Sequence, residues 1–270
     1  MEDLLSRLSI LPFAPDIIRE FGRDPAPGPL ADWAASDPVL FLSLLRAANA
    51  SSPQHRGCVG TLRGATELLG EAELYKMVAG QSLLAHTDSD DFSRFRRRFY
   101  GHSLCTGLAA REIALCAAEH GFLDPEEIYA AGVLHDAGKF IQEIYGARKP
   151  SEITRYASNA RMLYVEAELR VAGYTHTVLA GRLFAQWGFP ELLVRTARDH
   201  HAPVDAGGAE TAVCAIQLAG GVAHAMGYTL FDGETPPELD DVLLTRIGIT
   251  LDTLAVIRER TAEQLDKWHY

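Results

Sequence analysis

The feature that most constrains the fold is a series of helix starts, each followed by apolar residues at helical spacing. Asp37-Pro38 and Asp124-Pro125 each place an N-cap acid before a proline at the first helical position. Thr61 is suited to cap a further helix in a similar way. The apolar residues that follow recur every three or four positions, as they do on one helix face. Alternating β-branched runs between hairpin turns do not occur in the sequence. We therefore predict an all-α protein.

Two polar stretches divide the chain into three predicted units. Residues 86–91 read HTDSDD, and residues 227–237 read GYTLFDGETPP. We predict an N-terminal helical lobe over residues 1–88, a helical lobe that carries most of the histidines over residues 89–226, and a C-terminal helical tail over residues 227–270. The division rests on the polar composition of the junctions, which is typical of connecting loops.

Charge and cysteine usage limit the classes of partner and the compartment. A net charge of −11 argues against nucleic acid and against an anionic membrane as the main partner. The four cysteines show no CxxC spacing, which favours free thiols in a reducing compartment. The sequence has neither an N-terminal signal pattern nor a run of 18 apolar residues. We expect a cytoplasmic protein.

The candidate chemistry lies in a set of imidazole and carboxylate side chains within one helical unit. These groups hold divalent Mn, Fe, Ni or Zn, and open positions on such an ion support hydrolysis. One histidine alone is more often structural, but the set together indicates a site for one ion or a pair. Occupancy should fall below about pH 6, because ligation requires neutral imidazole. The predicted ligands are His102, His135, Asp136, His176, His200 and His201.

Local spacing gives further expectations about this site. In a continuous helix, His135 and Asp136 would diverge by about 100°, so a shared ion must lie between their directions. Lys139 lies one turn after His135, where its ammonium group is placed to bind a phosphate oxygen at the metal. Thr175 is a suitable N-cap, which would put His176 in the first turn of a helix.

The same residues resemble a known group of proteins. His102 and the dipeptide His135-Asp136 resemble the HD superfamily of metal-dependent phosphohydrolases, and His176 with His200-His201 resembles its HD-GYP branch of cyclic-di-GMP phosphodiesterases. The chain as a whole is most similar to the HDOD family, a related output domain of bacterial signalling proteins. The resemblance implies an HD-like helical bundle preceded by an N-terminal helical lobe. It rests on the ordered phrases LSILPFAPDIIREF, SDPVLFLSLLRAANAS, ATELLGEAELYKM, LHDAGK, THTVLAGRLFAQWGFPELL and ARDHH.

The sequence departs from the HD pattern in two places. HD enzymes of this kind close the site with an Asp in a phrase like LAD, whereas this chain has Leu218-Ala219-Gly220. By helical period Gly220 faces the site and offers no side chain, while Gln217 and His224 share its face and are placed to substitute in part. After Lys139 the chain continues FIQEIY, so the GYP phrase is absent, which argues against cyclic-di-GMP hydrolysis.

Three functions are compatible with these features. The first, which the resemblance favours because HDOD proteins are generally regarded as lacking HD hydrolase activity, is a non-catalytic signalling module that binds other signalling proteins, with or without a retained metal. The second is a metal-dependent phosphohydrolase or phosphodiesterase acting on a nucleotide or cyclic dinucleotide, with Lys139 binding phosphate. The third is a sensor that binds a metal, nucleotide or second messenger and changes a partner surface.

Overall fold

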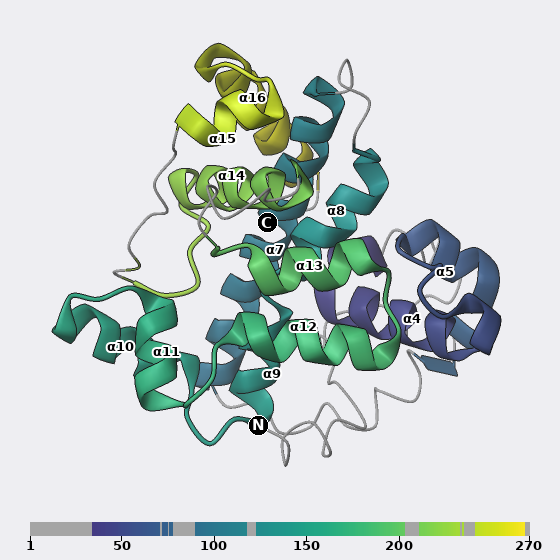
Figure 1. Cartoon of the computed structure of the whole chain (residues 1–270), viewed down its shortest axis with the longest axis horizontal. Coiled ribbons are helices and arrows are strands. Elements are labelled where there is room, and N and C mark those ends of the chain that lie inside the picture. Colours follow the sequence, from purple (N-terminus) through teal and green to yellow (C-terminus); the bar gives the residue numbers. More distant parts are fainter. Residues whose placement is uncertain are drawn as a thin grey trace.

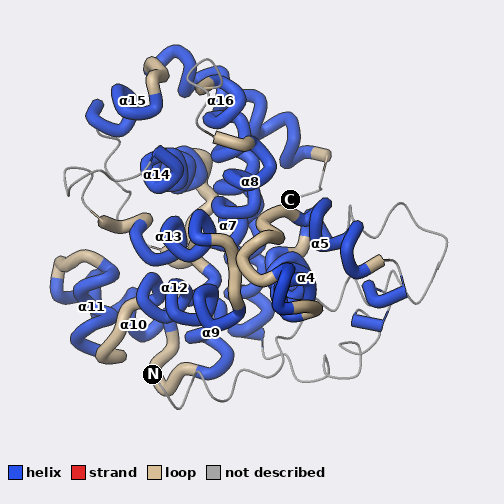
Figure 2. Tube along the Cα trace, turned by 45° about the vertical axis from the view of Figure 1, so that its right-hand side comes forward, coloured by secondary structure: helices blue, strands red, loops and turns tan. Residues whose placement is uncertain are grey.

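The computed structural model describes residues 34–70, 72–74, 76–77, 90–117, 123–202, 211–232, 234 and 241–267. The predictions that fall on LSILPFAPDIIREF and on residues 86–89 lie outside these described residues. Within them, every regular element is a helix, as Figure 2 shows. The all-α prediction is confirmed. None of the described helices combines the length and the apolar character needed to cross a bilayer.

The helices follow one another along the chain, with one 3-10 turn among them, as drawn in Figure 1. Their order is α4 (Pro38–Ala50), η1 (Pro53–His55), α5 (Leu62–Leu69), α7 (Asp90–Cys116), α8 (Pro125–Leu134), α9 (Ala137–Tyr145), α10 (Pro150–Ala160), α11 (Tyr164–Val171), α12 (His176–Trp187), α13 (Glu191–Asp199), α14 (Thr211–Ala225), α15 (Asp241–Ile247) and α16 (Leu251–Asp266).

The helix starts are fixed by side-chain caps. Asp37 accepts hydrogen bonds from two amides at the start of α4, both at 2.8 Å. Asp124 does the same for α8, and Thr61 and Thr175 cap α5 and α12. Each cap satisfies amides that have no partner within the helix, which is worth about 1 kcal/mol. The predicted caps are confirmed because their signal is local.

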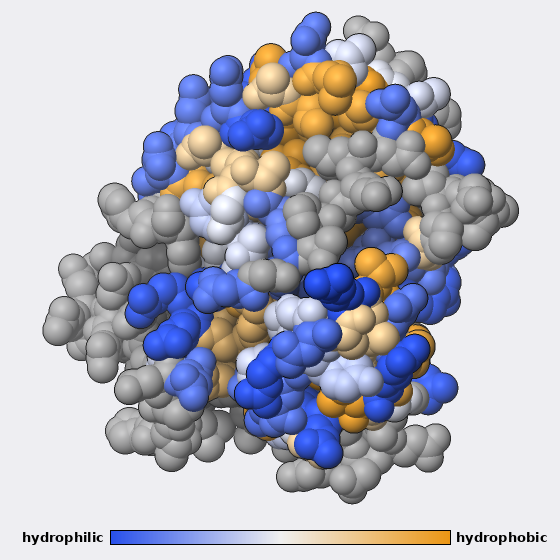
Figure 3. Space-filling model, turned by 90° about the vertical axis from the view of Figure 1, so that its left-hand side faces the viewer, coloured by the Kyte–Doolittle hydropathy of each residue, from blue (hydrophilic) through white to orange (hydrophobic). Residues whose placement is uncertain are grey.

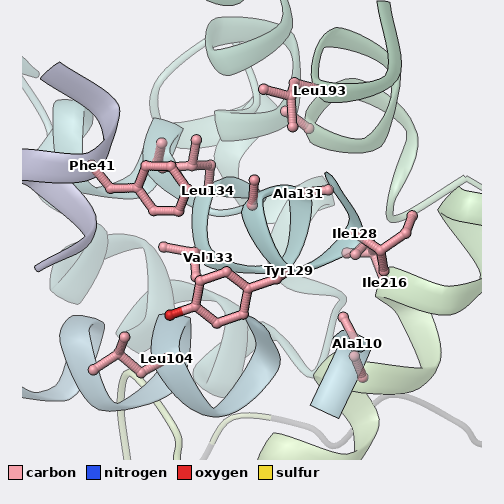
Figure 4. Packing of buried hydrophobic residues seen from close by; sticks show 14 of the residues in the cluster. Phe41, Leu104, Ala110, Ile128, Tyr129, Ala131, Val133, Leu134, Leu193 and Ile216 are labelled. Carbon is pink, nitrogen blue, oxygen red and sulfur yellow. The ribbon is translucent and has the colours of Figure 1, made fainter. Parts of the chain in front are cut away.

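The core forms around α7 and α8, which pack against each other near the middle of the molecule in Figure 1. Side chains of α4, α7, α13 and α14 meet beside α8 in Figure 4, among them Phe41 of α4, Leu104 of α7 and Ile216 of α14. Phe41 also stacks on Tyr129 of α8, with ring centroids 6.3 Å apart. One hydrophobic cluster thus includes residues of all three predicted units. The division into units stays a prediction.

A close approach of α7 and α8 brings two of the histidine-bearing segments together. A Cβ added at Gly132 on α8 would lie 2.8 Å from the Cα of Gly107 and 2.9 Å from the carbonyl oxygen of Thr106. Any side chain here would force the two helices apart. Glycine therefore permits the spacing that sets His102 of α7 near His135 at the end of α8.

The segment after α4 is attached to the C-terminal end of α12. The guanidinium group of Arg56 donates a hydrogen bond to the carbonyl oxygen of Gln186 at 3.0 Å. The amide of Gly57 donates to the carbonyl oxygen of Gly188 at 2.7 Å. Gly188 has a φ of 71°, the left-handed conformation that ends a helix with glycine. Arg56 and Gly57 thus donate hydrogen bonds to carbonyl groups at the end of α12 that have no partner within the helix.

Of the two C-terminal helices, α16 packs against α7 and α15 packs against α14. The side-chain amide of Gln264 on α16 donates to the Glu112 carboxylate at 2.7 Å. Their outer faces expose Val242, Leu251 and Val256, with Leu251 65% exposed. Figure 3 shows an apolar area at the upper end of one face of the molecule, at the height of α15 and α16 in Figure 1.

Candidate metal centre

Four segments that are far apart in the sequence bring the six predicted ligands together. His102 comes from the middle of α7, and His176 is the first residue of α12. His135 and Asp136 lie between α8 and α9, and His200 and His201 follow α13. The side chains form two groups that share one carboxylate: Asp136 with His102 and His135, and Asp136 with His176, His200 and His201.

The chain breaks its helical path at Asp136, which the sequence did not indicate. We expected a helix through His135 and Asp136, but α8 ends at Leu134 and α9 begins at Ala137. Asp136 has a φ of −97° and a ψ of 11°. The turn redirects the chain after Asp136, whereas His135 keeps helical angles, with a φ of −53° and a ψ of −39°. The two side chains still meet, since His135 Nε2 lies 3.5 Å from Asp136 Oδ2.

A glycine lets α9 approach the start of α12. A Cβ added at Gly138 would lie 2.1 Å from the carbonyl oxygen of His176. No side chain fits in that space, so the backbones make direct contact there. This contact, two residues after Asp136, places His176 against the Asp136 carboxylate.

The first group gathers on the Oδ2 atom of Asp136. The Nε2 atoms of His102 and His135 lie 3.6 Å and 3.5 Å from Oδ2. These two Nε2 atoms are 3.4 Å from each other. Two imidazole nitrogens and one carboxylate oxygen thus surround a common point.

The second group gathers on the Oδ1 atom of the same carboxylate. The Nε2 atoms of His176 and His200 lie 3.1 Å and 3.5 Å from Oδ1, and 3.3 Å from each other. His201 lies at the outer edge of this group and is exposed, with its ring centroid 4.4 Å from that of His200. Asp136 is therefore the bridge between two ligand groups.

Hydrogen bonds at the far ring nitrogens fix the tautomers of three buried histidines. A backbone carbonyl only accepts, so the Nδ1 atom bonded to it carries the proton and the Nε2 atom presents a lone pair. This is the arrangement that orients histidine ligands in metal sites. The three bonds run from His102 to Tyr228 at 2.9 Å, from His135 to Gly132 at 2.7 Å and from His200 to Ala197 at 3.1 Å.

The donor set fits a metal ion. The Nε2 lone pairs of His102 and His135 face each other and an anionic oxygen, an arrangement of acceptors that a cation between them stabilises. The buried Oδ1 of Asp136 receives no well-directed hydrogen bond from the described residues. Imidazole with one carboxylate is a ligand set for Fe, Mn, Ni or Zn. These residues are therefore suited to hold one ion or a pair.

Glu168 is a buried member of the site that the sequence did not reveal. Its Oε2 atom accepts from His176 Nδ1 at 2.7 Å, and its Oε1 atom accepts from the His176 amide at 3.0 Å. The side chain is fully buried. No local motif precedes Glu168, which reaches His176 only because α11 packs beside the start of α12. A carboxylate behind a histidine raises the basicity of that ligand.

Burial sets the protonation of most of the cluster. It lowers the pKa of His102 and of His200 below 6.5 and the pKa of His135 well below 6.5, in each case against the charge of Asp136. These imidazoles are neutral at pH 7, as ligation requires. His176 differs. Burial alone would lower its pKa, but the nearby carboxylates of Glu168 and Asp136 leave the pKa raised.

Lys139 pairs with the central carboxylate. Its Nζ atom lies 2.9 Å from Asp136 Oδ2 and 5.0 Å from the ring centroid of Tyr164. Burial alone would raise the pKa of Asp136, but Lys139 and His135 outweigh burial and hold that pKa well below 3.8. Asp136 is therefore ionised. The phosphate-binding role proposed for Lys139 is not tested by this contact.

The metal-free protein is expected to lose stability when it is acidified. The lowered pKa values of His102, His135 and His200 mean that, below pH 6.5, the unfolded chain takes up protons that the folded chain does not. The raised pKa of His176 contributes stability that is lost only as pH rises above 6.5. Thermal unfolding in EDTA should give a lower Tm at pH 5 than at pH 6.5. His135→Gln should reduce this difference in Tm between pH 5 and pH 6.5. An equal difference in both proteins would contradict the lowered pKa of His135 as a cause.

Gln217 and His224, which lie on the same face of α14 as Gly220, both contact residues outside this helix. Gln217 donates its side-chain amide to the carbonyl oxygen of Ala202 at 2.7 Å, next to His201. His224 Nε2 lies 3.6 Å from the Glu234 carboxylate. A Cβ added at Gly220 would meet no atom within 4 Å. Gln217 and His224 are therefore engaged with other groups, and their predicted substitution for the missing Asp stays a prediction.

Comparisons with solved structures find the same fold in several bacterial proteins. The MmoQ response regulator of Methylococcus capsulatus is 21% identical, with a TM-score of 0.69 over 93% of this chain and 99% of that chain. A virulence factor of Campylobacter jejuni is 19% identical, with a TM-score of 0.68 over 97% of this chain and 98% of that chain.

A third structure carries the family's name. It is an HDOD domain protein of unknown function from Geobacter sulfurreducens, 21% identical, with a TM-score of 0.53 over 98% of this chain and 93% of that chain. Among curated proteins, none matches the chain. The HDOD domain family matches residues 22–203, which include all six predicted ligands. This chain therefore belongs to the HDOD family.

Proposed function

We propose that this chain is a regulatory module of bacterial cytoplasmic signalling that holds a divalent transition metal and acts through protein partners without hydrolysing a substrate. The observation that carries the proposal is the convergence of imidazole Nε2 atoms on both oxygens of Asp136. His102, His135, His176 and His200 would hold the metal, which is Fe, Mn, Ni or Zn, with His201 at the edge. A bound ion would neutralise Asp136 and link four helical segments.

The burial of the cluster supports a role other than catalysis. His102, His135 and His200 are 6%, 4% and 5% exposed, and His176 is fully buried. Lys139, the group suited to bind phosphate, is 8% exposed and paired with Asp136. A phosphoester must reach both the metal and the lysine to react. The described residues leave little access for such a substrate.

Helix α11 connects the cluster to the surface. Its inner side carries Glu168, which bonds to His176, and Tyr164, whose ring centroid lies 5.9 Å from that of His176. Leu163 and Leu169, beside these two residues, are 58% and 57% exposed. Exposed apolar side chains suit a protein partner. A change in metal occupancy would thus act on a helix that a signalling protein can contact, which fits the fold shared with a response regulator.

The test combines metal analysis with an activity screen. Wild-type protein should contain transition metal by elemental analysis, and His135→Ala should lose most of it, because one Nε2 ligand and its contact with Asp136 are removed. Neither protein should hydrolyse cyclic-di-GMP or simple nucleotides in Mn²⁺ or Ni²⁺. Wild-type protein without metal would contradict metal binding.

The alternative is a metal-dependent phosphohydrolase. The two ligand groups that share Asp136 favour it, since paired ions can activate water and hold a phosphate together. In the same screen, turnover by the wild type that His135→Ala abolishes would establish this alternative and contradict the non-catalytic proposal.

A further inference from the structure

The loop after α14 contacts the first ligand group. Its Tyr228 carbonyl oxygen accepts the Nδ1 hydrogen bond of His102 at 2.9 Å. Farther along the same loop, Glu234 turns back, and its Oε2 atom accepts from the Leu230 amide at 3.0 Å. The Glu234 side chain is only 13% exposed. A buried carboxylate therefore lies on the segment that orients a predicted ligand.

Glu234 also lies beside the helix face that lacks the expected acid. Its Oε2 atom is 3.6 Å from His224 Nε2 on α14. His224 follows Gly220 by four residues, so the two positions are neighbours on one helix face. The space at Gly220 is open, because an added Cβ would meet no atom within 4 Å. Among the described residues, Leu230 and His224 both contact Glu234 through Oε2, which leaves Oε1 for another partner.

Charged groups of the cluster change the pKa of Glu234. Burial alone would raise its pKa, but the contact with His224 and the positive charge of Lys139 outweigh burial and lower that pKa. In return, the negative charge of Glu234 opposes the effect of burial on the pKa of Lys139, which is raised, and on the pKa of His102, which stays lowered. The geometric link between Glu234 and the His102 side of the cluster is their shared loop, which bonds to His102 through Tyr228 and contacts α14 through Glu234.

We propose that Glu234 supplies the carboxylate that Gly220 cannot, as an additional anionic group that helps to hold the metal on the His102 side of the cluster. The proposal rests on the proposed metal-binding function. A second carboxylate matters there because Asp136 alone provides the negative charge among the six predicted ligands. The competing explanation is that Glu234 only holds its own loop, through Leu230 and His224.

Manganese binding separates the two explanations. Mn²⁺ affinity should be measured by titration calorimetry on metal-stripped wild type, Glu234→Gln and Asp232→Asn. The Gln side chain still accepts from the Leu230 amide, so this variant removes the charge and keeps the loop contact. Asp232 is the matched control, an acid of the same loop whose side chain is 92% exposed and paired with Arg98. We expect about 10- to 100-fold weaker binding in Glu234→Gln and wild-type binding in Asp232→Asn.

Two further results complete the test. Wild-type Mn²⁺ affinity in Glu234→Gln would overturn this proposal and leave the metal-binding function standing, whereas absence of binding in the wild type would overturn both. If metal-free Glu234→Gln also melts below the wild type, the double variant Glu234→Gln/Gly220→Asp decides. Recovery of Mn²⁺ binding in that double variant supports the proposal, because a carboxylate on α14 then replaces the one on the loop. Failure to recover in that case would show that Glu234 only supports the fold.

Discussion

Asp136→Asn is expected to lower the free energy of unfolding of the metal-free protein by about 3–5 kcal/mol. The reason is the buried ion pair with Lys139, whose Nζ atom lies 2.9 Å from the carboxylate, with both side chains at most 10% exposed. Burial alone would lower the pKa of Lys139, but the charges of Asp136 and Glu234 outweigh burial and raise it. An amide at position 136 would leave the ammonium charge without its nearest counter-ion.

Urea unfolding in EDTA measures this effect, and a double variant identifies its cause. Asp136→Asn/Lys139→Met removes both charges, so its free energy of unfolding should exceed that of Asp136→Asn. An equal loss in the single and double variants would show that the Lys139 charge is not the cause. Wild-type stability in Asp136→Asn would show that the pair contributes nothing measurable.

Gly138→Ala is expected to destabilise the fold by about 1–3 kcal/mol and to weaken metal binding. The added Cβ would lie 2.1 Å from the carbonyl oxygen of His176, so the start of α12 must move away from α9. That movement separates His176 from Asp136, which are 3.1 Å apart. Urea unfolding and Mn²⁺ titration should therefore change together.

Gly220→Ala is the matched control for this substitution. Its Cβ would meet no atom within 4 Å, and alanine in a helix interior is favoured over glycine by about 1 kcal/mol. We expect equal or greater stability in Gly220→Ala. Comparable losses in both variants would contradict the view that the contact between α9 and α12 is what requires glycine at position 138.

The helix starts could be predicted because their determinants are local. Asp37, Thr61 and Asp124 each bond to amides two or three residues ahead, so a short stretch of sequence contains both partners. The grouping of His102 with His135-Asp136 and the later histidines was also predictable, but through family resemblance. No local sequence pattern predicts that these histidines, which are far apart in the sequence, lie close together in the fold.

The remaining parts of the site depend on packing between helices. Glu168 reaches His176 because α11 lies beside α12, and nothing in the sequence around Glu168 marks it as different from a surface acid. Glu234 is similarly unmarked in the sequence, since the loop after α14 is what brings it within 3.6 Å of His224. The break at Asp136 was also missed, because the apolar period continues on both sides of it.

The contacts at the end of α12 have a mechanical consequence. Arg56 and Gly57 hold the C-terminal end of this helix, and His176 is its first residue at the other end, about 18 Å away. A helix of this length moves as a stiff rod. Any displacement of the segment around Arg56 that keeps these hydrogen bonds must therefore draw α12 along, and His176 shifts against Asp136. Movement of the segment at Arg56 and Gly57 would in this way change the distance between His176 and Asp136.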